Sequence, residues 1–150
     1  MQSWPSRHQP WPPGNGKLVR NQMLRVCRSG GRILVRDVTP ADDKAGRYDA
    51  TEKLRDPSHT HALTIDEMHA LNAGLSIDEI SFTTRRTPPV PLESILATSF
   101  PGACSLDDLR SAFLEDARSG QDRLGYAAAL IDSQVHIRFR MSTGVWRKRE

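Results

Sequence analysis

The sequence predicts an α/β fold in which the last strands of an open parallel sheet are followed by an antiparallel C-terminal hairpin, with helices flanking the sheet. Residues 32–38 (RILVRDV) contain three consecutive apolar residues between two helix signals, as in a strand covered on both faces. From Val135 to Ser142, apolar and polar residues alternate, which is typical of a half-buried antiparallel strand. Together these patterns favour a parallel sheet with an antiparallel edge.

Composition indicates a globular chain of one ordinary domain. The chain has 150 residues, of which 37% are hydrophobic and 26% charged, so it is long enough to bury a core. It has no apolar run of the ~18–20 residues that a membrane helix needs. Cys27 and Cys104 follow no metal-binding or disulfide spacing. We therefore expect a cytoplasmic protein without a membrane segment.

Residues 1–22 differ from the rest of the chain. They include four prolines and show no apolar periodicity, and each proline removes a backbone donor. We expect these residues to form a disordered or loosely docked arm. The domain then comprises residues 23–150.

The first predicted unit is a helix end, a turn, a strand and a second helix. A helix ends within residues 21–27, and Gly30-Gly31 supplies a left-handed stop. After the strand, Thr39 is expected to cap a helix that has Pro40 at its first position. That helix is predicted to run to about Arg55, just before an Asp-Pro pair.

The second unit begins with a capping box formed by Thr64 and Glu67. The helix after it is expected to face the core with Ile65, Met68 and Leu71, or Leu75 in place of Leu71, and to end at Gly74. A strand follows at residues 76–86, whose inward candidates are Ile77, Ile80 and Phe82.

The remaining elements are two helices and a hairpin. Prolines precede a short helix predicted at residues 92–100, and Ser105 is expected to cap a helix that Gly120 closes. The hairpin is predicted from strands at 126–131 and 135–141, with a turn at 132–134.

Charge is divided along the chain. The net charge is +3 over residues 1–22, −4 over residues 23–122 and +4 over residues 123–150. This is not the continuous basic face of a nucleic-acid binder, and no recognition motif is present. Nucleic-acid binding by the basic ends therefore ranks last among the functions considered.

Three stretches resemble the class I S-adenosylmethionine-dependent methyltransferases, particularly the ubiquinone/menaquinone methylase-like group. "LRVCRSGG" at residues 24–31 leads into a strand ending in Asp37, as before the fifth strand of that family. "EKLRDPSHTHALTIDEMHALNAGL" at residues 52–75 is similar to the segment before the sixth strand. "GVWRK" at residues 144–148 looks like the end of the seventh strand. The resemblance implies an incomplete Rossmann-like sheet, the C-terminal half of a methyltransferase.

In this family the first half of the fold binds S-adenosylmethionine, through a glycine-rich turn and an acid that grips the ribose. A βαβ unit needs roughly 30 residues, so residues 1–22 are too few for that half. Gly14-Asn15-Gly16 is a lone G-x-G with no preceding strand, and Lys17 lacks the Ser or Thr of a phosphate loop. We expect no cofactor-binding residues here and no cofactor binding by this chain alone.

The sequence identifies no catalytic residue, but Asp37, Asp56 and His59 are candidates to face the substrate. Asp37 ends a parallel strand, where open α/β sheets place ligands, or it caps the next helix. The resemblance places Asp56 and His59 beside the acceptor site, where the histidine would orient the acceptor or take its proton. Alternatively, Asp56 bonds the backbone of a turn and His59 packs against it.

A metal site is a weaker interpretation of the histidines. His59, His61 and His69 lie close in the sequence, but no cysteine or carboxylate stands at a structural zinc spacing. Surface histidines without a common role are the favoured interpretation, so no metal is expected.

The favoured function is the C-terminal portion of a methyltransferase acting on a small-molecule acceptor, inactive without its cofactor-binding half. The partner would be a complementary methyltransferase half. The alternative is a non-enzymatic module that covers an exposed sheet edge by self-association or by binding a catalytic homologue.

Overall fold

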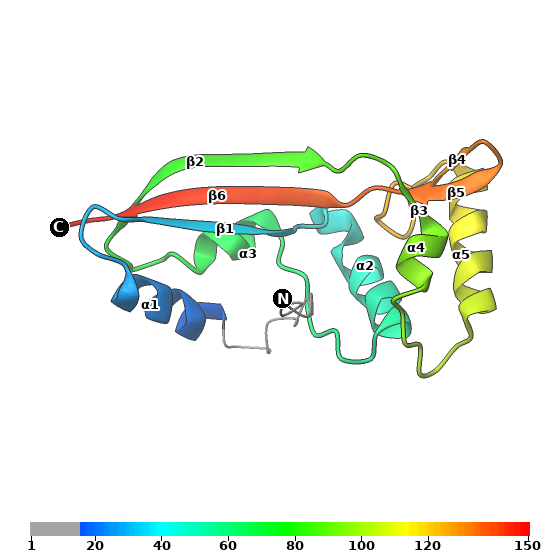
Figure 1. The fold of residues 1–150 in the computed structure, drawn as a ribbon, viewed down its shortest axis with the longest axis horizontal. Coiled ribbons are helices and arrows are strands. Elements are labelled where there is room, and N and C mark those ends of the chain that lie inside the picture. Colours follow the sequence, from blue (N-terminus) through cyan, green and yellow to red (C-terminus); the bar gives the residue numbers. More distant parts are fainter. Residues whose placement is uncertain (1–15) are drawn as a thin grey trace, which may run out of the picture.

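The computed structural model describes residues 16–150, whose strands form two separate sheets (Figure 1). The larger sheet has the order β1-β6-β2, made of Arg32–Val38, Arg140–Lys148 and Ile77–Arg86. The smaller has the order β3-β5-β4, made of Val90–Pro91, Gln134–Ile137 and Ala129–Ile131. No helix within residues 16–150 combines the length and apolarity needed to cross a membrane.

The predicted strand arrangement needs a correction. β6 runs antiparallel to both β1 and β2 and lies between them, so the antiparallel strand is central and not at the edge. β1 and β2 point the same way but do not pair with each other. The C-terminal strand separates them, an arrangement that local sequence patterns do not reveal.

Two small residues allow β6 to occupy this central place. The buried hydroxyl of Ser142 hydrogen-bonds with that of Thr39 after β1 and, at 2.8 Å, with that of Thr84 in β2. A Cβ at Gly144 would lie 1.8 Å from the ring of Trp146, so only glycine leaves room for that ring. The Ser142 hydroxyl therefore links β6 to both neighbouring strands, and the absence of a side chain at Gly144 makes room for the Trp146 ring.

Helix α1 spans Gly16–Val26, so residues 16–22 of the expected arm are helical. All four prolines of the expected arm precede residue 16 and do not interrupt this helix. The guanidinium of Arg20 stacks 4.1 Å from the centre of the Trp146 ring, and this contact anchors α1 under β6. The rest of the expected arm, residues 1–15, lies outside the described residues.

Helix α2 spans Asp42–Arg55 and ends where the sequence predicts, but Ala41 and not Thr39 is its N-cap. The Thr39 hydroxyl is taken up by Ser142, so it does not bond the first amides of the helix. Two aspartates in the first turn still interact favourably with the helix dipole.

Helix α3, Ile65–Ala70, has the predicted capping box of Thr64 and Glu67, and it buries Met68. The predicted inward position of Ile80 is wrong, because this side chain is 41% exposed. A β-bulge between Glu79 and Ser81 shifts the register there, so Ile80 does not follow the alternation of inward and outward side chains along β2.

The segment between β2 and β6 forms a small subdomain beside α2 (Figure 1). α4, Leu92–Leu96, is shorter than predicted, whereas α5, Leu106–Ser119, has the expected Ser105 cap and ends at Gly120 with φ of 64°. The hairpin has β4 and β5 as its strands, and the predicted alternating strand is split between β5 and β6. The chain bends between them because the amide of Arg138 bonds the carbonyl of Tyr126 and that of Phe139 bonds the hydroxyl of Thr87.

The main hydrophobic core lies between this subdomain, α2 and the loop after α2. Phe113 is fully buried, and the edge of its ring meets Tyr126, which stacks on Tyr48 of α2. The other buried members of the cluster are Ala62, Leu92, Leu96, Leu109, Ala128 and Ile137.

Replacing Phe113 by Ala is expected to lower the free energy of unfolding by about 3–5 kcal/mol, because a large buried ring leaves a cavity. Phe100 is the matched control, since its ring is 76% exposed and Phe113 is 0% exposed. Phe100→Ala should change the free energy by less than about 0.5 kcal/mol. Urea unfolding measures both, and equal effects would contradict this placement of the core.

Candidate functional site

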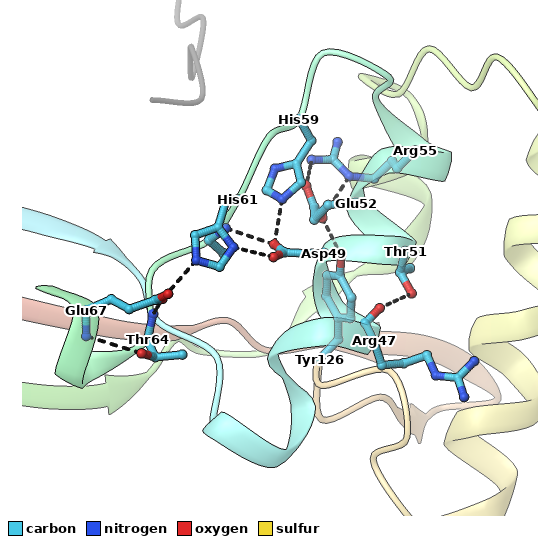
Figure 2. A network of polar contacts seen from close by, with 11 residues as sticks. Arg47, Asp49, Thr51, Glu52, Arg55, His59, His61, Thr64, Glu67 and Tyr126 are labelled. Atoms are coloured by element: carbon cyan, nitrogen blue, oxygen red, sulfur yellow. Dashed lines mark hydrogen bonds and ion pairs between the residues drawn. The ribbon is translucent and has the colours of Figure 1, made fainter. Parts of the chain in front are cut away.

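The candidate site lies between α2 and the loop that follows it, and Asp49 of α2 is at its centre. Figure 2 shows this carboxylate between His59 and His61. One oxygen of Asp49 lies 2.8 Å from Nε2 of His59 and the other 2.6 Å from Nδ1 of His61. The backbone amide of Ala62 donates to the same carboxylate at 2.8 Å. Asp49 therefore fixes the course of the loop through three hydrogen bonds.

The cluster extends to α3 through His61. Its Nε2 lies 2.8 Å from the carboxylate of Glu67, whose same oxygen also accepts the amide of Thr64 (Figure 2). The imidazole of His61 thus bridges a carboxylate on α2 and one on α3. This geometry couples the position of the loop to that of both helices.

These contacts shift the titration of the cluster. Desolvation opposes the charged form of His61, but hydrogen bonds to Glu67 and Asp49 outweigh it and raise the His61 pKa above its ordinary value of 6.5. Burial likewise disfavours the charged form of Asp49, yet the hydrogen bonds from His59, the Ala62 amide and His61 lower its pKa. Both shifts favour the charged form, the protonated imidazole of His61 and the ionised carboxylate of Asp49.

His59 is the better placed of the two histidines for proton transfer. Its side chain is 12% exposed, and Asp49 engages only its Nε2. When the carboxylate accepts the proton of Nε2, the neutral ring carries its lone pair on Nδ1. An Asp–His pair arranged in this way orients a histidine as a general base.

Asp56 and Asp37 have local partners. Asp56 accepts the amide and the hydroxyl of Ser58 and so forms a tight turn before His59. Those hydrogen bonds lower the pKa of Asp56.

Asp37 lies at the end of β1, half-buried, and accepts the amide of Val38. Its negative charge contributes to raising the pKa of Tyr48, after burial and Glu52, so Asp37 lies near α2. The structure thus brings Asp56 to the turn before His59 and sets Asp37 at the sheet end beside the same helix.

A second network lies one helical turn further along α2. The buried carboxylate of Glu52 accepts the hydroxyl of Tyr126 and two guanidinium hydrogen bonds from Arg55 (Figure 2). Arg55 also approaches the hydroxyl of Ser99 at 3.4 Å. Burial, followed by the charge of Glu52, raises the pKa of Tyr126 well above its usual range. This network fastens α2 to the subdomain of α4 and α5.

The sequence interpretation missed Asp49 and the bridging role of His61. Asp49 is one acid among several on α2, and only the return of the loop brings His59 and His61 against it. Within residues 16–150, no group of three or more His, Cys, Asp or Glu side chains is placed to hold a metal ion. The two nitrogens of His61 point to different carboxylates, so the groups of this cluster do not converge on one point.

Stability is expected to depend on pH through His61. Since its pKa is higher in the folded chain, its contribution is fully present below pH 6.5 and is lost as the pH rises through the folded pKa. Asp49 acts oppositely, because its contribution is present above pH 3.8 and is lost as the pH falls through its lowered pKa.

His61→Gln should therefore destabilise the chain near pH 6, by less than about 1 kcal/mol for such an exposed group, and the effect should shrink at higher pH. His136→Gln is the control, because the imidazole Nδ1 of His136 lies 3.2 Å from a backbone carbonyl, that of Gln134, and not beside a carboxylate. Urea unfolding from pH 5 to 9 measures both. A His61→Gln effect that does not change with pH would contradict the bridging role.

Comparison with known proteins identifies the fold. No protein-family model and no curated protein sequence matches the chain. Among solved structures, a protein from Bacillus halodurans C-125, provisionally named a methyltransferase, matches 91% of this chain with a TM-score of 0.72 and 17% identity. The YcgJ protein from Bacillus subtilis matches 89% with a TM-score of 0.61 and 20% identity. The chain spans 64% and 58% of the lengths of these two proteins, and it shares the fold of that part of each.

Proposed function

We propose that this chain is the acceptor-side portion of an S-adenosylmethionine-dependent methyltransferase that modifies a small molecule. The observation that carries the proposal is the structural match, which covers 91% of the chain and includes a protein named as a methyltransferase. In the proposed enzyme, a cofactor-binding half, joined to this chain or supplied as a separate polypeptide, completes the sheet. The chain alone would then be inactive.

The open edge of β1 supports this division. The amide of Thr39 bonds the carbonyl of Arg140, and the alternation of an antiparallel ladder then turns the amides of Ile33, Val35 and Asp37 toward β6. The amides of Arg32, Leu34 and Arg36 point the other way, where no strand lies within residues 16–150. A further strand can add at this edge by backbone hydrogen bonding.

The Asp49–His59 pair gives the proposed chemistry its proton acceptor. S-adenosylmethionine supplies an electrophilic methyl group when bound, and methyl transfer depends mainly on proximity and orientation. We assign His59 to hold the acceptor hydroxyl or amine through Nδ1 and to take its proton, while Asp49 fixes the ring. Asp56 shapes the turn that presents His59, and Asp37 stands at the sheet end as a further candidate to face the acceptor.

The open edge also supports a second candidate, a non-enzymatic module that binds a partner through β1. Self-pairing of two β1 strands about Leu34 would set Arg32 of one copy opposite Arg36 of the other. Like charges directly opposite each other destabilise a sheet. A complementary half is therefore favoured over a second copy as the occupant of this edge.

The folded 150-residue chain is expected to show no calorimetric binding of S-adenosylmethionine, with circular dichroism confirming that it is folded. Under this proposal, the part of the Bacillus halodurans protein that the match leaves uncovered supplies the strand beside β1, so fusing the chain to that part should create binding. S-adenosylhomocysteine is the second probe, since it shares the nucleoside and lacks the methyl group.

Micromolar binding or methyl transfer by the chain alone would contradict the proposed division. A folded fusion that binds neither probe would contradict the methyltransferase function and favour the non-enzymatic module. Light scattering on the same samples distinguishes a monomer from a self-associated chain, which the charge argument disfavours.

A further inference from the structure

The face of the larger sheet that carries the even-numbered residues of β1 is largely exposed. Along β1, the exposed residues Arg32, Leu34 and Arg36 alternate with the better-covered Ile33, Val35 and Asp37. Their register partners on β6 lie on the same face, because directly paired residues of an antiparallel ladder share a face. This face contributes nothing to the Asp49 cluster and is considered separately from the proposed function.

A hollow of about 220 Å³ lies on this face near the carboxyl ends of β1 and β2. Arg36 of β1, Thr143 of β6 and Thr83 of β2 stand in one row across the three strands. Arg85 stands in the next row on the same face, opposite Met141. These five residues line the hollow, and because neighbouring strands are about 4.8 Å apart, the two arginines flank a space the width of a small molecule.

The hollow is positively charged, and two of its three arginines are not neutralised by a carboxylate within residues 16–150. Arg86, the third arginine lining it, forms an ion pair with Asp122 at 3.4 Å. Within residues 16–150, Arg36 and Arg85 form no ion pair, and the hydroxyls of Thr83 and Thr143 have no hydrogen-bond partner. Like charges held together at a concave surface attract a multiply charged anion.

We propose that this hollow binds the phosphate group of a small phosphomonoester. Guanidinium groups recognise phosphate oxygens through paired N–H donors, and threonine hydroxyls supply further donors. Arg36 and Arg85 hold the dianion between them, and Thr83 and Thr143 donate from the floor of the hollow. Met141 and Pro88 form an apolar wall, which suits the organic part of an ester better than free phosphate.

The test is an NMR titration of the folded chain with phenyl phosphate, with inorganic phosphate and benzoate as comparison ligands. Saturable shifts of the Thr83 and Thr143 amides are expected for phenyl phosphate, with weaker affinity for inorganic phosphate and weakest for benzoate. Arg36→Gln or Arg85→Gln should each weaken phenyl phosphate binding about tenfold or more, as expected for a lost hydrogen bond to a charged group. Arg36→Lys, which keeps the charge but loses the paired donors, should also weaken it.

Arg32→Gln is the matched control, because Arg32 is exposed on the same strand and face but does not line the hollow. It should change the affinity less than twofold. Equal losses for Arg32→Gln and Arg36→Gln would show that only general charge attraction is present and would overturn the site. Absence of saturable shifts in the unsubstituted chain, or benzoate binding as tightly as phenyl phosphate, would overturn it as well.

Discussion

The fold depends on the insertion of the C-terminal strand β6 between β1 and β2, two strands that are far apart in the sequence. The buried hydroxyl of Ser142 bonds hydroxyls on both sides of β6, and the absence of a side chain at Gly144 makes space for Trp146. The Trp146 ring in turn receives the guanidinium of Arg20, which holds α1 against the sheet. Without β6, β1 and β2 would have no partner within residues 16–150, because neither pairs with the other.

Helix α2 carries the two carboxylates, Asp49 and Glu52, that organise the candidate site and the contact with the subdomain. Asp49 and Glu52 are three residues apart, so they lie on neighbouring parts of the helix surface. Asp49 binds His59 and His61 of the loop, while Glu52 accepts the hydroxyl of Tyr126 from the subdomain and the guanidinium of Arg55 from the end of α2 itself. Both carboxylates are multiply hydrogen-bonded, which offsets the cost of removing their charges from water. One helix thereby sets the position of the proposed acceptor site relative to both the sheet and the subdomain.

Local signals in the sequence predicted what is local in the structure. The capping box at Thr64, the N-cap at Ser105, the left-handed stop at Gly120 and the end of α2 at Arg55 are confirmed, because each depends on residues within one turn. The sheet order, the bulge that exposes Ile80 and the capture of the Thr39 hydroxyl by Ser142 depend on β6, which is distant in sequence. For the site, the turn at Asp56 and His59 was predicted from its motif. The hydrogen bonds of His59 and His61 to Asp49 were not predicted, because contacts made across a folded loop produce no periodic pattern in the sequence.

The central claim is that β1 is an edge strand of the sheet formed by residues 16–150 and receives the next strand from a cofactor-binding half. Amide hydrogen exchange measured by NMR on the monomeric chain tests it most directly, because a lone edge strand protects only alternate amides. We predict slow exchange at Ile33 and Val35, which face β6, and fast exchange at Leu34 and Arg36. In the fusion that restores the upstream half, the amides of Leu34 and Arg36 should become protected as well. Strong protection of Leu34 and Arg36 in the monomeric chain alone would show that the edge is already paired and would contradict the account.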